Sequence, residues 1–181
     1  LGTVIVAWDE TGLEMGREIY CARRTPDAPW SVPENVSASP MLDSTFPALA
    51  TSYDYSEYPA ESNLAPARSL HVAWVEGSIM PPLTTVVYRV WDPARGWFPP
   101  PPDPPEDVTA GIGGASPSIA AGPDRVPKVA WTTSQEPPEA MPTRPSDVLY
   151  NERTNAGWGT PIRVSLPDGP AGTASLCPTI A

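Results

Sequence analysis

The run Leu70-His71-Val72-Ala73-Trp74 is the most informative part of the sequence for the fold class, because the chain repeats its pattern. The same pattern occurs as Val4-Ile5-Val6-Ala7-Trp8 and as Pro127-Lys128-Val129-Ala130-Trp131. Short runs rich in Val, Ile and Trp, bounded by Pro, Gly and Asp, are typical of β-strands. Three copies in one chain indicate a repeat protein in which each copy is one small structural unit.

Three further elements accompany the Val-Ala-Trp runs in a fixed order. After each run come a tyrosine that ends an apolar run, then a tryptophan and then a valine: Tyr20, Trp30 and Val36; Tyr88, Trp97 and Val108; Tyr150, Trp158 and Val164. A proline-containing element precedes two of the runs and recurs at the end of the sequence: 45–50, 115–120 and 176–181. We expect its proline at the first paired position of a strand. We interpret the three tyrosines as equivalent packing residues. Four short strands per repeat predict the blade of a β-propeller.

The predicted fold is therefore all-β, with three four-stranded propeller blades in a single unit over residues 1–181. Blade 1 spans 1–38 together with a first strand from 176–181, blade 2 spans 45–110 and blade 3 spans 115–166. Because propellers have roughly four to eight blades, we expect half of a six-bladed ring. A second copy of the chain or other blades of a longer chain would complete it, and strand donation that failed to close would give a filament. In a homodimer the donated assembly strand would comprise Leu176, Cys177, Pro178, Thr179 and Ile180.

The composition excludes two classes of partner. The chain carries 21 acidic and 11 basic side chains, a net charge of −10, which is unfavourable for binding nucleic acid through its phosphates. No run approaches the length of apolar sequence that spans a membrane.

The 27 prolines exclude a helical bundle, whereas seven Trp and six Tyr oppose disorder. An acidic, aromatic and proline-rich composition favours a secreted or cell-surface protein.

The order of these elements resembles the blades of sialidase-like propellers of secreted bacterial proteins. In that family an Asp-box, S-x-D-x-G-x-x-W, lies in the turn between the third and fourth strands, and the corresponding turns here are degenerate: 25–30, 92–97 and 154–158. The resemblance implies a sialidase-like glycoside hydrolase, or a fragment of one, as an alternative function. Such an enzyme needs three arginines that converge on a carboxylate and a Tyr–Glu nucleophile pair. Because the arginines fall on the outer predicted strands, we favour a non-enzymatic module that binds carbohydrate or protein. A subunit of a larger cell-surface or filamentous assembly is a third alternative.

One segment of the second repeat has no counterpart in the others, and it supplies the candidate ligand residues Tyr53, Asp54, Tyr55, Glu57 and Tyr58. Such aromatic and acidic side chains can stack on sugars or bind Ca²⁺, and a solvated loop is the alternative. We predict no catalytic residue and no cofactor apart from this Ca²⁺. His71 occupies a variable position of the repeat, so we expect it to face solvent or to lie at the rim, without a catalytic role. Cys21 and Cys177 would lie two strands apart, beyond disulfide reach unless the pairing shifts or another chain takes part.

Overall fold

The protein is described by a computed structural model that covers residues 2–11, 16–54, 67–78, 84–122, 124–133, 147–165 and 178–181. These residues form thirteen β-strands and contain no helix. The all-β prediction is confirmed. The strands correspond to the repeated elements, because each Val-Ala-Trp run forms a strand and each run ending in Tyr forms the next one.

Three antiparallel sheets follow one another along the chain. The first sheet contains β1 (Val4–Thr11), β2 (Arg17–Arg24) and β3 (Glu34–Asn35). The second contains β4 (Leu42–Asp54), β5 (Ala67–Ser78), β6 (Thr85–Asp92), β7 (Gly96–Phe98) and β8 (Glu106–Asp107). The third contains β9 (Ala115–Ala121), β10 (Pro127–Thr132), β11 (Val148–Thr154), β12 (Gly157–Trp158) and β13 (Ile162–Arg163). The expected fourth strand is therefore split into two short strands in the second and third sheets.

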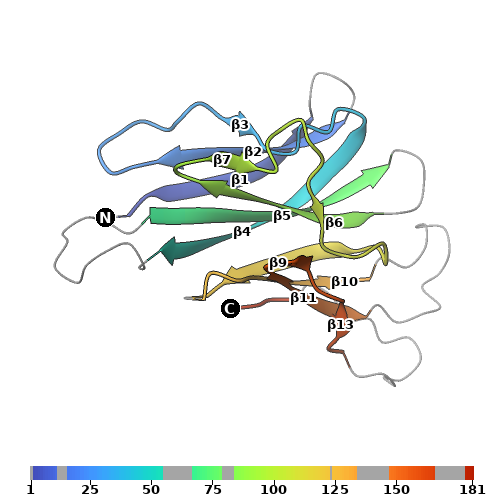
Figure 1. The fold of residues 1–181 in the computed structure, drawn as a ribbon. Helices are drawn as coiled ribbons and strands as arrows, with labels where there is room; N and C mark the ends of the chain where they lie inside the picture. Colours follow the sequence, from blue (N-terminus) through green and yellow to red (C-terminus); the bar gives the residue numbers. More distant parts are fainter. Residues whose placement is uncertain are drawn as a thin grey trace.

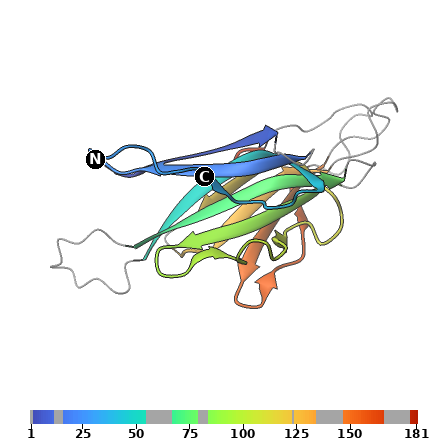
Figure 2. The same ribbon diagram turned by 90° about the horizontal axis from the view of Figure 1, so that it is seen from above.

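The sheets are stacked face to face, the first at the top of Figure 1 and the third at the bottom. Figure 2 shows the same order in blue, green and orange. In the second and third sheets, we call the face that is turned toward the preceding sheet the front face, and the opposite face the rear face. In the first sheet, the rear face is the one turned toward the second sheet, and the front face is the opposite one. The stack is open, and the residues that the structure describes form no closed propeller ring. β1 is an edge strand, whereas β4 and β9 extend the second and third sheets beyond the corresponding β5 and β10.

The strand registers define which residues of the three sheets are equivalent. Ala7 pairs with Cys21, Ala73 with Tyr88 and Ala130 with Tyr150. Since the three alanines belong to the Val-Ala-Trp runs, Cys21 is the equivalent of Tyr88 and Tyr150. The expectation that Tyr20 is their equivalent is wrong by one residue, and Tyr20 points to the opposite face of its strand because side chains alternate.

The outer ends of the repeats confirm this assignment through main-chain hydrogen bonds. The N–H groups of three valines donate to carbonyl oxygens at one equivalent position, Val36 to Ile19 at 2.7 Å, Val108 to Val86 at 2.9 Å and Val164 to Val148 at 2.9 Å. The hydroxyl that follows the valine also recurs. Ser37 Oγ accepts from Ile19 N–H at 2.9 Å and Ser165 Oγ accepts from Val148 N–H at 3.2 Å.

The prolines of the inner strands lie at β-bulges, and not at the first paired position as expected. The pairing of β4 with β5 shifts between Thr45 and Ala48, so that Phe46 and Pro47 together face Trp74. The third sheet has the same shift at Ser116 and Pro117, opposite Trp131. Phe46 and Ser116 adopt φ of 55° and 50°. A bulged residue is left out of the regular ladder, so the missing N–H of proline is tolerated inside each strand.

Two clusters of buried side chains fill the spaces between the sheets. Between the first and second sheets lie Ile19, Cys21, Val36, Leu70, Val72, Trp74 and Val87. Between the second and third sheets lie Ala73, Val86, Tyr88, Val108, Ile119, Val129, Trp131 and Leu149. In the second and third sheets, the Val and Trp side chains of the Val-Ala-Trp run thus lie on the front face. The rear face of the preceding sheet covers them.

Candidate assembly surface

The front face of the first sheet has no sheet in front of it among the described residues. Its central residue, Trp8, is partly exposed, whereas Trp74 and Trp131 at the equivalent positions are 0 % exposed. Trp8 stacks on Tyr20 with ring centroids 6.1 Å apart. Its Nε1 donates to the Glu10 carboxylate at 3.1 Å. Trp8 is therefore less buried than the two tryptophans at the equivalent positions.

The residues around Trp8 show the same difference from their equivalents. Val4 and Val6 are 52 % and 42 % exposed, while Leu70 and Val72 are 2 % and 0 % exposed. Trp30 is 45 % exposed, whereas its equivalents pack onto the rear face of the preceding sheet. We define the front patch as Val4, Val6, Trp8, Tyr20 and Trp30. It is an apolar surface of the kind that the other two sheets bury.

The buried tryptophans show how such a front face is covered. Trp131 packs on the rear face of the second sheet, in a socket formed by Val86, Tyr88 and Val108. Its Nε1 donates to the carbonyl oxygen of Gly113 at 3.2 Å. The fit is close, because a Cβ placed on Gly114 would lie 2.5 Å from Trp131 Cδ1. Trp74 packs against Ile19, Cys21 and Val36, the equivalent residues of the first sheet.

A third socket of the same kind lies on the rear face of the third sheet. Val148, Tyr150 and Val164 are the equivalents of Val86, Tyr88 and Val108. We define these three residues as the rear socket. Val164 is 57 % exposed, the neighbouring Ile162 is 59 % exposed, and Val148 and Tyr150 are partly exposed. The described residues therefore present a partly exposed tryptophan at one end of the stack and a partly exposed apolar socket at the other.

The Tyr150 hydroxyl at this socket is held by a carboxylate. It donates to Glu152 at 2.9 Å. Partial burial, and then the hydrogen bond to Glu152 and its negative charge, raise the pKa of Tyr150 to about 12. The group is therefore neutral throughout the physiological range, and burial likewise raises the pKa of its equivalent Tyr88.

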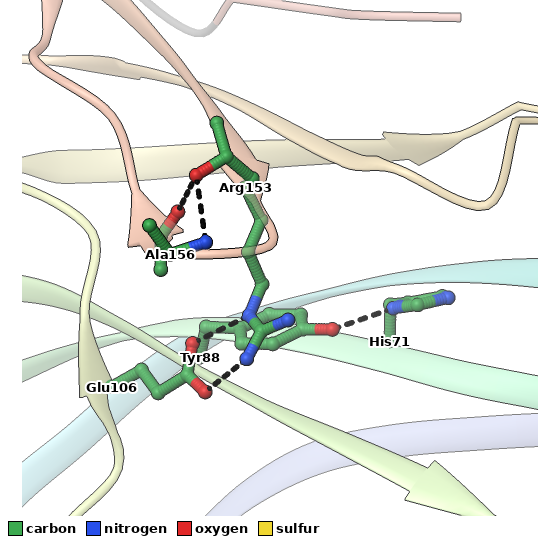
Figure 3. A network of polar contacts seen from close by, with 7 residues as sticks. His71, Tyr88, Glu106, Arg153 and Ala156 are labelled. Carbon is green, nitrogen blue, oxygen red and sulfur yellow. Dashed lines mark hydrogen bonds and ion pairs between the residues drawn. The ribbon is translucent and has the colours of Figure 1, made fainter.

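A polar chain crosses the rear face of the second sheet (Figure 3). Ser52 Oγ lies 2.8 Å from His71 Nε2, and His71 Nδ1 lies 2.7 Å from the Tyr88 hydroxyl. His71 is 4 % exposed, so the expectation that it faces solvent is wrong. Burial, reinforced by the positive charge of Arg153, lowers the pKa of His71 to about 4. The imidazole is neutral at pH 7, and two neighbouring strands satisfy both of its nitrogens.

Arg153 belongs to the third sheet and reaches back to the second. Its Nε and Nη2 donate to the two oxygens of Glu106, both at 2.8 Å (Figure 3). This bidentate bond raises the pKa of Arg153. Arg89, which is fully buried, donates to the carbonyl oxygens of Pro99 at 2.9 Å and of Asp103. Both arginines are engaged within the protein, at two different interfaces between sheets, and do not converge on one site.

The predicted ligand segment lies mostly outside the described residues. Tyr53 and Asp54 extend β4 and pair with Arg68 and Ala67 of β5, so the strands continue into what was expected to be a loop. Tyr55, Glu57 and Tyr58 lie outside the described residues, as do Leu176 and Cys177 of the assembly strand. Cys21 is buried with a free thiol. No group of three or more His, Cys, Asp or Glu side chains that could hold a metal occurs in the described part of the chain.

The described end of the assembly strand lies against the third sheet. The N–H of Ile180 donates to Ser118 Oγ at 3.2 Å. Ser118 is the equivalent of Ala48, whose side chain packs on the rear side of the second sheet. Pro178, Thr179 and Ile180 therefore lie behind β9, much as β9 itself lies behind β4, and they have no strand partner among the described residues.

Comparison with protein-family models, with curated proteins and with solved structures gives no match for this chain. Within the described residues, no helix is long and apolar enough to cross a membrane.

The front patch and the rear socket were not predicted from the sequence, although the sequence contains the signal for both. Every second residue of a strand shares a face with the repeat tryptophan. Counting in steps of two from Trp8 selects Val6 and Val4, and counting from Val148 selects Tyr150. The misaligned tyrosines concealed this regularity, because they placed Tyr20 on the face that Cys21 occupies.

Proposed function

We propose that the chain is a non-enzymatic binding and assembly module, built as three blades of a β-propeller, whose front patch binds a further blade. One observation carries the proposal. The repeat positions that are apolar and buried in the second and third sheets are equally apolar in the first, where Trp8 is partly exposed and Val6 is 42 % exposed, beside the fully buried Trp74 and Val72. A large exposed apolar patch on a folded protein marks an interaction site.

The partner surface is a β-sheet face, because that is what covers the same residues inside the molecule. One edge of β1 has no partner strand among the described residues, and this supports the proposal, since such an edge offers main-chain donors and acceptors to an added strand. An extracellular or cell-surface location agrees with the acidic, proline-rich composition. In this proposal the buried His71–Tyr88 and Arg153–Glu106 contacts hold the blades together and do not serve catalysis.

The proposal is tested with a charge placed at the centre of the patch. Trp8→Glu is compared with the native chain by light scattering during size exclusion, with Arg95→Glu on the exposed turn between β6 and β7 as the control. We expect the native chain and the control to exceed the monomer mass of 19.3 kDa. We expect Trp8→Glu to return to the monomer mass while keeping its β-sheet circular dichroism. A native chain that is monomeric at every concentration, and that Trp8→Glu leaves unchanged, contradicts the proposal.

A further inference from the structure

We infer that the partner of the front patch is a second copy of this chain, and that its rear socket receives Trp8. The inference rests on the proposed function and names its partner. Each copy would present its first sheet to the third sheet of the other, so that two copies close one ring of six sheets. Among multiples of three, only six lies within the roughly four to eight blades of known propellers.

The socket already holds a tryptophan at both interfaces between the described sheets. Val86, Tyr88 and Val108 hold Trp131, and the equivalent residues of the first sheet hold Trp74. The rear socket repeats the Val-Tyr-Val set of the second sheet, whose occupant is a tryptophan of a Val-Ala-Trp run. Trp8 is the remaining tryptophan of that type and is only partly covered. The front face of the first sheet and the rear face of the third sheet therefore repeat the two kinds of face that meet at each interface between the described sheets.

The outer tryptophan of each repeat also fits a contact between two copies. The Trp158 ring meets the Tyr88 ring edge to face, with centroids 5.1 Å apart and an interplanar angle of 80°. By equivalence, Trp30 of one copy would meet Tyr150 of the other in this way. Trp30 is 45 % exposed and Tyr150 is partly exposed, so both rings are accessible to a partner.

The charges at the two ends of the stack are complementary. At the first interface the Arg23 guanidinium of the rear face lies 4.0 Å from the ring centroid of Trp91 on the facing front face. The residue equivalent to Arg23 in the third sheet is Glu152, and the residue equivalent to Trp91 in the first sheet is Arg24. Both are exposed. In a dimer, Glu152 of one copy would thus lie opposite Arg24 of the other. Inside the chain, Arg23 lies over the Trp91 ring at the equivalent place.

The described end of the assembly strand lies in a suitable place for donation to a second copy. Pro178–Ala181 already lies behind the third sheet, where the inner strand of a following sheet would lie. Its sequence aligns with the inner strands, so that Ile180 corresponds to Leu49 and Ile119, which pair with Val72 and Val129. Their equivalent in β1 is Val6. The inference therefore fixes a register in which Ile180 of one copy lies opposite Val6 of the other.

The principal test mixes two variants that are defective at opposite ends. Trp8→Glu removes the residue that enters the socket and Val164→Glu blocks the socket, so each variant alone has two damaged interfaces in a dimer. An equimolar mixture can form one dimer in which both changes fall on the same interface and the other interface is native. We expect each variant to run at 19.3 kDa and the mixture to recover dimer, with circular dichroism to show that each variant is folded.

A crosslink tests the register without damaging the interface. Val6→Cys and Ile180→Cys are combined in a Cys177→Ser chain. Opposed residues of antiparallel strands have Cα atoms about 4.5–5.5 Å apart, which is within disulfide reach. We expect an oxidised dimer on a non-reducing gel. The control pairs Val6→Cys with Thr179→Cys, one residue out of register and on the opposite face of the strand, and should crosslink far less.

The outcomes separate the inference from the proposed function. Trp8→Glu could dissociate the assembly while Val164→Glu does not and the crosslink fails. In that case the front patch binds some surface other than the rear socket, which contradicts the inference but not the proposed function. Mass that grows with concentration beyond two copies contradicts the closed ring. If removal of residues 176–181 leaves the native mass and stability unchanged, the assembly strand is not donated and the inference is wrong.

Discussion

The side-chain amide of Asn151 donates a hydrogen bond of 2.9 Å to the carbonyl oxygen of Val108, and so links the third sheet to the rear of the second. The same amide donates to the carbonyl oxygen of Gly159 at 3.0 Å within its own sheet. Arg89 holds the equivalent position one sheet earlier and reaches back toward the carbonyl oxygen of Ser37 at 3.5 Å. One register position thus carries a polar link between sheets at both internal interfaces.

Replacement of Asn151 should therefore destabilise the fold. Asn151 is 2 % exposed, so Asn151→Ala leaves two carbonyl oxygens without these donors in a buried site. We expect the free energy of unfolding to fall by about 1–3 kcal/mol. Asn151→Asp should cost more at neutral pH, because it removes the donors and buries a charge. Urea unfolding followed by fluorescence measures both variants, and a loss below about 0.5 kcal/mol for Asn151→Ala would show that the link does not contribute.

The buried His71 should make the protein sensitive to acid. Its folded pKa is about 4, below the value of about 6.5 expected in the unfolded chain. The unfolded state therefore binds more protons between these values, and stability falls as the pH is lowered from about 6.5 to about 4. The largest loss from this group is about 3 kcal/mol. His71→Gln should flatten the pH dependence in that window, and equal slopes for the two proteins would contradict the assignment.

The close approach of Gly114 to Trp131 should make the position intolerant of a side chain. An added Cβ would lie 2.5 Å from Trp131 Cδ1 and 2.9 Å from Val86 Cγ2. We expect Gly114→Ala to reduce the free energy of unfolding by about 1–3 kcal/mol through overpacking. Gly122→Ala is the matched control, since its methyl group would meet only the movable Asp124 carboxylate at 3.2 Å. Similar unfolding midpoints for the two variants would be inconsistent with a tightly filled socket.

The Cys21 thiol should be unreactive until the protein unfolds. It is 3 % exposed, and burial raises its pKa to about 11. In a Cys177→Ser chain Cys21 is the remaining cysteine of the two in the sequence. An aromatic disulfide reagent at pH 8 should modify it slowly in buffer and rapidly in denaturant, because the thiolate is the attacking species. Equal rates in the two conditions would mean that the first interface opens readily.

The repeating strands could be predicted because their signal is local. Alternating Val, Ile and Trp residues define a strand whatever its neighbours are, and the Val-Ala-Trp runs of β1, β5 and β10 agree with this. The register between strands is not local. Tyr20 looks equivalent to Tyr88 in sequence, but the pairing with Ala7 and Ala73 shows a displacement of one residue.

His71 illustrates why the polar contacts could not be predicted. A histidine at a position held by Ile5 and Lys128 in the other repeats suggests a solvent-facing site. Its burial depends on Ser52 and Tyr88, which lie on the two flanking strands and supply a partner for each ring nitrogen. The burial of such a polar side chain depends on partners that are distant in sequence, and no local sequence pattern predicts those partners.

The prolines at the bulges have a consequence for the solubility of the chain. An edge strand with a continuous row of free N–H and C=O groups is a template on which other chains aggregate. Pro47 and Pro117 interrupt that row on the edge strands β4 and β9, both by lacking a donor and by breaking its spacing. β1 has no proline between Val4 and Thr11. Of these three edges, two are protected against unwanted pairing, and β1 alone keeps an uninterrupted edge that a newly arriving strand can extend.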